Sequence, residues 1–161
     1  MQPMADHLRE ELAKLLNKYD EERRVVLARE KKLKEEDALF IARFAELRKS
    51  VIRPAFEAAA AILAERGHRV SIAEQEFAVD SAAKVTEAAI SLYIVPSGMQ
   101  STVHDERGRA LTIATRHYNK TVWINTGRPQ EASKGNYVLE KVDRELVEAE
   151  LIGFVAGIVA A

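Results

Sequence analysis

The sequence predicts an α+β fold with one long N-terminal helix, an antiparallel sheet of about five strands, and a C-terminal helix packed on the sheet. Three observations support this prediction. Residues 1–66 contain no glycine, and their prolines lie only at positions 3 and 54. After Gly67 the apolar residues alternate with a period of two, which is typical of half-buried strands. Residues 142–161 return to a helical spacing behind a capping aspartate.

The first segment is rich in Ala, Leu, Glu, Lys and Arg, and it predicts one helix from Ala5 to Arg66. Such a helix is about 93 Å long, whereas the remaining chain folds into a body about 30 Å across. We therefore expect a projecting helical arm, residues 1–37, and an α+β domain, residues 38–161, joined by one continuous helix. Pro54 should kink this helix near residues 51–53, and Gly67 should cap its end.

A heptad repeat runs along the arm, with apolar residues at every a position and mostly charged residues at d. The expected oligomer interface comprises the a residues Leu12, Tyr19, Val26, Leu33, Phe40 and Leu47 and the charged d residues Glu22, Arg29, Glu36 and Arg43. Leu8 and Leu15 continue the d positions towards the N-terminus. The pattern predicts a homo-oligomer, with a dimer as the simplest form.

The charged d positions indicate how two arms pair. A parallel dimer in register sets Glu22 against Glu22 and Arg29 against Arg29, which is repulsive. In an antiparallel pair whose opposed residue numbers sum to 65, Glu22 meets Arg43 and Arg29 meets Glu36. The same register sets Val25 and Val26 against Phe40 and Leu39. The competing interpretation is that these charges are solvated on a helix that lies over its own sheet.

Alternating residues predict strands at 88–95 and 110–114, and a last strand at Tyr137–Val142. Residues 68–80 fit a strand with a bulge near Glu74–Gln75 better than a short helix opened by a capping box at Ser71. Asp80–Lys84 should turn into the next strand. Two hairpin turns are expected, a type I turn at Asp105–Gly108 and a two-residue loop at Asn119–Lys120.

The C-terminal helix has recognisable entry chemistry. Asp143 is the expected N-cap, and Val142 and Val147 occupy the positions of a hydrophobic staple. Gly153 and Gly157 leave a flat strip on this helix that another backbone can approach closely. The expected buried stripe is Val147, Leu151, Phe154, Val155 and Ile158.

The composition narrows the function classes. Lys and Arg total 24 against 25 for Asp and Glu, so no net field recruits nucleic acid or an anionic membrane. There is no cysteine, and standard catalytic, phosphate-binding and metal-binding motifs are missing. His104, Asp105 and Glu106 are interpreted as a solvated turn, and His117 as a histidine at the edge of the core. We expect no metal and no cofactor. The N-terminus lacks a signal-peptide pattern, so a cytoplasmic location is expected.

Four residues form the candidate binding face of the sheet: Tyr93, Arg116, Tyr118 and Trp123. A two-residue loop at Asn119–Lys120 would set Arg116 opposite Trp123 on one face, as a cation–π pair worth about 0.5–1 kcal/mol. The surrounding residues are small, so a few aromatic side chains would stand on a flat face. The alternative is an ordinary solvent-exposed face stiffened by one aromatic pair.

The function expected from these patterns is a non-catalytic, self-associating protein-interaction or assembly module, with itself and an unidentified protein as partners. Neither nucleic acid nor a membrane is an expected partner. The alternative is a small-molecule-binding protein with a pocket between the sheet and the helices. An enzyme of unfamiliar type ranks below both, because it requires titratable groups that converge in a cleft.

Overall fold

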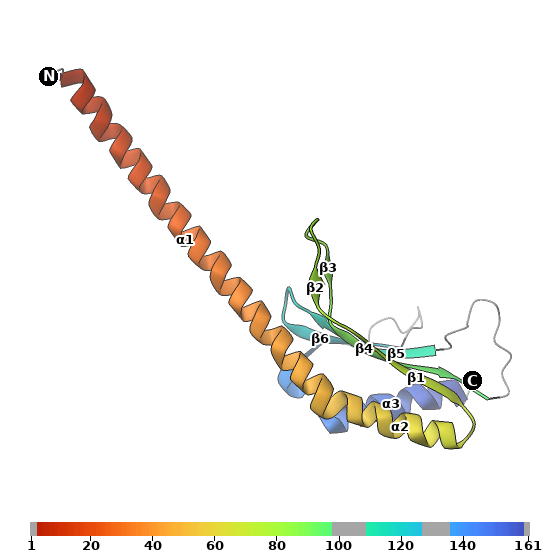
Figure 1. Ribbon diagram of the computed structural model, residues 1–161. Coiled ribbons are helices and arrows are strands. Elements are labelled where there is room, and N and C mark those ends of the chain that lie inside the picture. The colour runs from red at the N-terminus through yellow and green to blue at the C-terminus, as the bar shows by residue number, and fades with distance from the viewer. Residues whose placement is uncertain (1–2, 98–108, 127–135, 160–161) are drawn as a thin grey trace. The chain divides into compact units, whose positions relative to one another are not determined.

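The computed structural model describes residues 3–97, 109–126 and 136–159. It confirms the α+β fold, with a long N-terminal helix, a five-stranded antiparallel sheet and a C-terminal helix (Figure 1). The chain divides into two compact units, Met1–Ala38 and Leu39–Ala161. The described part of the first unit is helical throughout, and the second unit holds the sheet and the hydrophobic core.

The long helix consists of α1 (Pro3–Leu47), a π-helical turn (Arg48–Ile52) and α2 (Arg53–Glu65). The disturbance expected from Pro54 takes the form of this π-helical turn, which directly precedes the proline. A wider turn accommodates the proline ring, which otherwise meets the carbonyl group four residues earlier. The predicted glycine cap is also present: Gly67 has φ +87°, and its N–H donates to Ala64 O at 3.0 Å.

The main sheet has the strand order β1-β4-β5-β6-β7, and all neighbouring strands are antiparallel. A separate hairpin, β2 (Ala78–Val79) and β3 (Val85–Thr86), closes around Asp80, whose Oδ1 accepts from the N–H groups of Ala82 and Lys84 at 2.9 Å. Residues 69–75 are a strand, as preferred over a short helix. The main strands are β1 (Arg69–Gln75), β4 (Ala89–Val95), β5 (Arg109–Arg116), β6 (Thr121–Asn125) and β7 (Asn136–Val138).

Two local predictions were wrong. The β5–β6 loop has four residues, His117–Lys120, because Arg116 pairs with Thr121. A two-residue loop with a type I′ turn needs positive φ at both positions. Among these four loop residues only Lys120, at +54°, has a positive φ. The strand predicted at Tyr137–Val142 ends at Val138 and continues as a 3₁₀ turn, Leu139–Lys141. The turn predicted at residues 105–108 lies outside the described residues.

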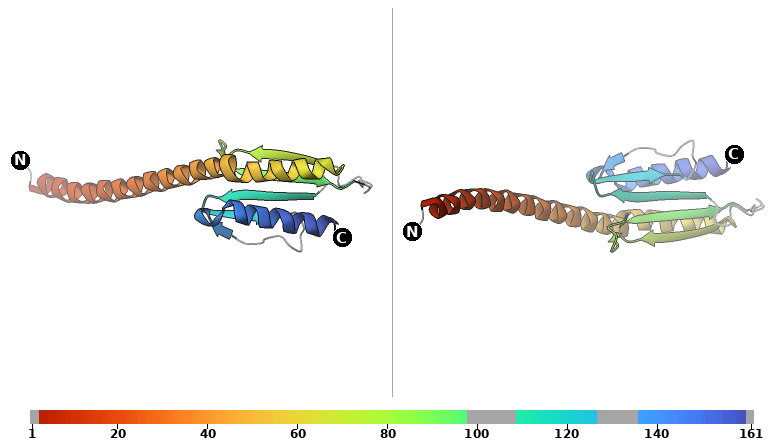
Figure 2. Two further views of the ribbon diagram at one scale, coloured as in Figure 1. Left: turned by 90° about the horizontal axis from the view of Figure 1, so that it is seen from below. Right: turned by 90° about the horizontal axis from the view of Figure 1, so that it is seen from above.

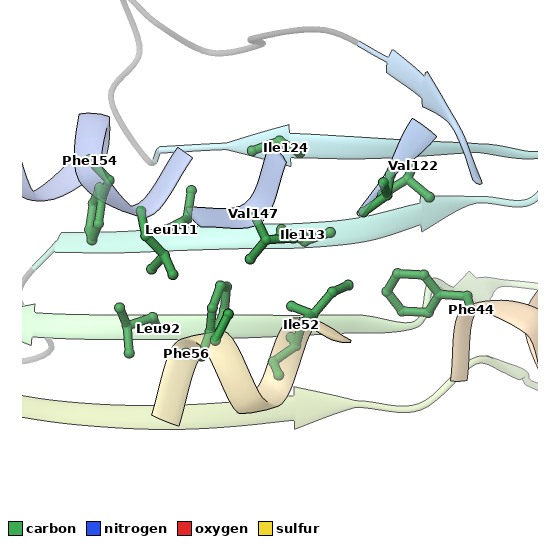
Figure 3. Packing of buried hydrophobic residues seen from close by; sticks show 14 of the residues in the cluster. Phe44, Ile52, Phe56, Leu92, Leu111, Ile113, Val122, Ile124, Val147 and Phe154 are labelled. Carbon is green, nitrogen blue, oxygen red and sulfur yellow. The ribbon is translucent and has the colours of Figure 1, made fainter. Parts of the chain in front are cut away.

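The core lies between one face of the sheet and the helices of the second unit. In Figure 2, α2 runs over β1 and β4, whereas α3 (Arg144–Val159) runs over β5 and β6. Side chains from the helices meet every second residue of the strands (Figure 3). The helical side chains include Ile52, Phe56, Val147 and Phe154, and the strand side chains include Leu92, Leu111 and Ile113. The space between the sheet and the helices is therefore occupied by hydrophobic side chains.

Helix α3 begins as predicted. Asp143 Oδ1 accepts from the Leu146 N–H at 2.8 Å, and Val142 and Val147 are both buried. The predicted stripe is buried except for Val155, which is partly exposed. A Cβ built on Gly153 or Gly157 would meet no atom of another described element within 4 Å, and Arg109 Nη1 donates to Gly157 O at 3.4 Å.

Candidate functional site

The arm segment of α1 keeps large apolar side chains in contact with water. Every residue from His7 to Glu36 is exposed, including the charged d residues Glu22, Arg29 and Glu36. The large apolar residues here expose between 46% and 63% of their surface: Leu8, Leu12, Leu15, Leu16, Tyr19, Val25, Val26, Leu27 and Leu33. We call the apolar a and d positions of the heptad repeat the seam. Folding of the single chain leaves the seam exposed in this segment.

The last two a positions of the seam lie in the second unit, where they are buried or packed against its core. Phe40 is 5% exposed and Leu47 packs against the core, so these two a residues are core residues of the single chain. In the single chain, Phe40 is therefore not accessible for the contact expected between Val25 and Phe40 of two copies. Arg43 is exposed and lines a shallow groove of about 490 Å³, which is also lined by Glu46, Leu47, Ser50, Leu139 and Glu140.

Arg116 and Trp123 form the cation–π contact that the sequence suggests, although the register differs by two residues. Trp123 lies opposite Ala114, and the Arg116 guanidinium carbon is 5.1 Å from the centre of the indole ring. A shift of two residues keeps each side chain on its expected face, so the pair survives as a diagonal contact. Arg116 therefore contacts the face of the indole ring, and Trp123 Nε1 is buried without a hydrogen-bond partner among the described residues.

The other two residues of the candidate binding face lie elsewhere. Tyr93 is opposite Ala110, four residues along β5 from the row of Trp123, which places the two rows about 13 Å apart. Tyr118 belongs to the β5–β6 loop, is 67% exposed, and meets the edge of the His117 ring. The structure thus brings Arg116 and Trp123 together, but not all four residues.

Tyr93 instead takes part in a shallow groove of about 510 Å³ along the edge strand β1. The groove is lined by Arg69, Val70, Ser71, Ile72, Ala73, Tyr93 and Val95. The strand register sets Ser71 opposite Tyr93 and Arg69 opposite Val95. These residues share the sheet face opposite the core-facing Ile94 and Leu92, because side chains alternate along a strand.

A polar cluster at one end of the sheet was not predicted. Glu87 accepts from the Thr115 hydroxyl at 3.1 Å and from the His117 N–H at 3.3 Å, and its Oε2 is 2.9 Å from His117 Nδ1. Phe77 packs edge-on against the His117 ring, with ring centres 5.4 Å apart. His117 therefore lies at the core edge with its ring held by a carboxylate. The partner was missed because Glu87 precedes β4, and only the strand register brings it near β5.

A second unpredicted cluster surrounds a buried arginine. Arg48 is 7% exposed, pairs with Glu76 at 2.6 Å and Glu74 at 3.3 Å, and donates to Gln75 O at 3.2 Å. The sequence does carry a signal for it, because Arg48 interrupts an apolar stripe spaced by four residues: Phe40, Phe44, Ile52 and Phe56. A cation in such a stripe needs paired carboxylates if it is buried.

Arg53 extends this cluster to the surface of α2. Its Nε donates to Glu57 at 2.7 Å, and its Nη1 is 3.5 Å from Glu74. The hydrogen bond to Glu57, with the nearby Glu74 carboxylate, raises the pKa of Arg53 above its ordinary value. The arginine therefore stays charged, and the cluster ties the C-terminal half of β1 to the helix above it.

The described residues contain no group of three His, Asp or Glu side chains arranged to hold a metal ion. His104, Asp105 and Glu106 lie outside them. No helix among residues 3–97 and 136–159 is long and apolar enough to cross a membrane. Comparison with known proteins finds no matching family model, curated protein or solved structure.

Proposed function

We propose that this protein is a self-associating interaction module in which the long helix, from α1 to α2, pairs with the long helix of a second copy. The observation that carries the proposal is the row of nine large apolar side chains between residues 8 and 33, each at least 46% exposed. In proteins, most of the stability of a helix comes from packing an apolar face against a partner. A second copy supplies the same apolar stripe and the same charges.

The energy available is of the right order for a dimer. Burying the exposed half of a Leu, Val or Tyr side chain contributes on the order of 1 kcal/mol. Six seam residues from each helix then contribute about 12 kcal/mol in total, against an association cost of about 4–15 kcal/mol. These residues are Leu8, Leu12, Leu15, Tyr19, Val26 and Leu33. With a cost near the lower end of this range, about 4 kcal/mol, the balance is about −8 kcal/mol, which corresponds to a micromolar dissociation constant.

The charges favour an antiparallel pair. With opposed residue numbers summing to 65, Glu22 lies near Arg43 and Arg29 lies near Glu36, and all four side chains are exposed and available. Leu39 is 52% exposed and can still cover Val26, whereas Phe40 cannot contribute. The antiparallel arrangement therefore keeps both charge pairs and one of the two expected apolar contacts at this position.

The test is the solution mass combined with a charge swap. One chain has a mass of 18.0 kDa, so light scattering at micromolar concentration should give about 36 kDa for a dimer. Arg43→Glu should weaken the dimer about tenfold, because two surface ion pairs per dimer become repulsive. Adding Glu22→Arg should restore the dissociation constant of the unaltered protein.

Lys31→Glu is the matched control. It makes the same change of charge at an exposed position of α1 that points away from the seam, and it should leave the dissociation constant unchanged. A monomer at micromolar concentration contradicts self-association. A double variant no tighter than Arg43→Glu alone contradicts the antiparallel register.

A further inference from the structure

The sheet ends at an edge strand whose two halves differ. Strand β1 pairs with β4 alone, so its outer backbone groups have no ladder partner among the described strands. In the C-terminal half, Arg48 and Arg53 of the helix contact Glu74, Gln75 and Glu76. Charged side chains of this kind discourage a further strand from pairing. In the half from Arg69 to Ala73, no ion pair of this kind is made by the described residues.

The half of β1 from Arg69 to Ala73 also lines the groove of about 510 Å³. The groove exists because Ser71 and Ala73 are small, whereas Tyr93 on the neighbouring strand is large. A strand added beside β1 would place one side chain directly next to Ser71, about 5 Å away on the same face. A large apolar side chain there fills the hollow and reaches the Tyr93 ring.

The other face of the same strand requires apolar neighbours as well. Val70 and Ile72 point towards the helices and pack against the core, yet each is only partly buried. Residues of an added strand opposite these two positions would cover their remaining exposed surface. The edge therefore fits an extended segment that is apolar at three consecutive positions.

The positive charge of Arg69 indicates which kind of segment binds at this edge. Arg69 is exposed, and its side chain has no ion pair or hydrogen bond within the described chain. On the groove face β1 carries Arg69, Ser71, Ala73 and Gln75, none of them acidic. A second copy of β1 paired antiparallel with matching faces therefore gives Arg69 no carboxylate. If the second copy instead set its Glu74 opposite Val70, the Glu74 carboxylate would lie among the core-facing side chains.

From this edge, groove and charge we propose that β1 is a peptide-docking site. The occupant is an extended segment of another protein that pairs antiparallel with Arg69–Ala73, seats a large apolar side chain over Ser71 against Tyr93, and sets an acidic side chain opposite Arg69. Main-chain hydrogen bonds provide the affinity in such β-augmentation, and the alternate side chains provide the selectivity. The site is independent of self-association through α1.

The experiment uses the full-length chain and three labelled peptides. The first has the sequence Thr-Val-Leu-Val-Asp, which sets Leu opposite Ser71 and Asp opposite Arg69. The second ends in Lys in place of Asp, and the third has Pro in place of both Val residues, which removes two backbone N–H groups and holds φ away from the extended values of a strand. Fluorescence anisotropy should show saturable binding of the Asp peptide below about 1 mM, about fivefold weaker binding of the Lys peptide, and none of the Pro peptide.

Two protein variants and one control complete the test. Ser71→Tyr fills the groove at an exposed position and should weaken the Asp peptide at least tenfold. Arg69→Glu should reverse the preference between the Asp and Lys peptides. Lys84→Glu makes the same change of charge in the exposed turn between β2 and β3, and should change nothing. Amide shifts on binding should be confined to β1 and the adjacent part of β4.

Four results of the peptide experiments would overturn the proposal. They are the absence of saturable binding, equal binding of the Pro peptide, indifference to Ser71→Tyr, and an unchanged preference in Arg69→Glu. A change in the protein's own solution mass on Ser71→Tyr, without any peptide, would mean that a second copy occupies the edge and would also overturn it. None of these results depends on whether α1 pairs, so the two proposals fail separately.

Discussion

Two adjacent residues of α3 provide a matched test of how this helix packs. Leu151 is 5% exposed and belongs to the core, whereas its neighbour Ile152 is 71% exposed. Leu and Ile have the same number of atoms, so truncation to Ala removes the same amount of side chain from both positions. The difference between the two variants therefore reports burial alone, apart from a small difference in helix propensity.

The expected magnitudes are well separated. Leu151→Ala removes buried methyl groups and leaves a cavity, which lowers the free energy of unfolding by about 2–5 kcal/mol. Ile152→Ala leaves no cavity and should change it by less than about 0.5 kcal/mol. Since whole-domain stability is typically about 5–15 kcal/mol, the first variant loses a large fraction of it.

The assay is urea unfolding followed by circular dichroism, with the midpoint and slope fitted for each variant. Equal slopes with a lower midpoint for Leu151→Ala alone would support the packing. Equal destabilisation by the two variants, or a larger loss from Ile152→Ala, would refute it. That outcome would mean that the stripe of Leu151 and Phe154 faces away from the sheet, and the arrangement in Figure 3 would be wrong.

Three further substitutions test local interactions by the same unfolding assay. Arg48→Ala should lower the free energy of unfolding by about 1–3 kcal/mol, because it removes a buried side chain together with its hydrogen bond to Gln75 O and its ion pairs to Glu74 and Glu76. Equal loss from the exposed Lys49→Ala would contradict a role for this cluster. Glu87→Ala should cost about 1–3 kcal/mol, since the buried Thr115 hydroxyl and the His117 N–H lose an acceptor, and a neutral result would argue against the cluster. Gly67→Ala should cost about 1 kcal/mol, because the positive φ is unfavourable for alanine although a Cβ has room there.

The sequence was informative wherever a pattern is local. Helix length followed from the absence of breakers, the Gly67 cap and the Asp143 cap from single residues, and the strand positions from a period of two. The N-terminal strand was chosen correctly over a helix. Each of these features depends on interactions within a few residues, which the order of the residues determines directly.

The sequence was less informative wherever strands or distant segments must be paired. The β5–β6 register was off by two residues because Asn119–Lys120 resembles a tight turn, and only the sheet shows that Arg116 meets Thr121. Glu87 and His117 are 30 positions apart, so their contact has no local signature. Phe40 satisfies both a heptad position and a core stripe, and the pattern alone does not separate these two roles.

The central claim, antiparallel pairing of two α1 helices, is tested most directly by distances between identical spin labels in a dimer. The chain has no cysteine, so Asn17→Cys and Lys31→Cys, both exposed and away from the seam, each give a single label per copy. In the proposed register residue 17 lies opposite residue 48, which separates the two labels by about 46 Å along the helix axis. Residue 31 lies opposite residue 34, an axial offset of only about 5 Å. Double electron–electron resonance should therefore give a long distance at position 17 and a short one at position 31. Short distances at both positions would contradict the antiparallel arrangement, and no intermolecular signal at either would contradict self-association itself.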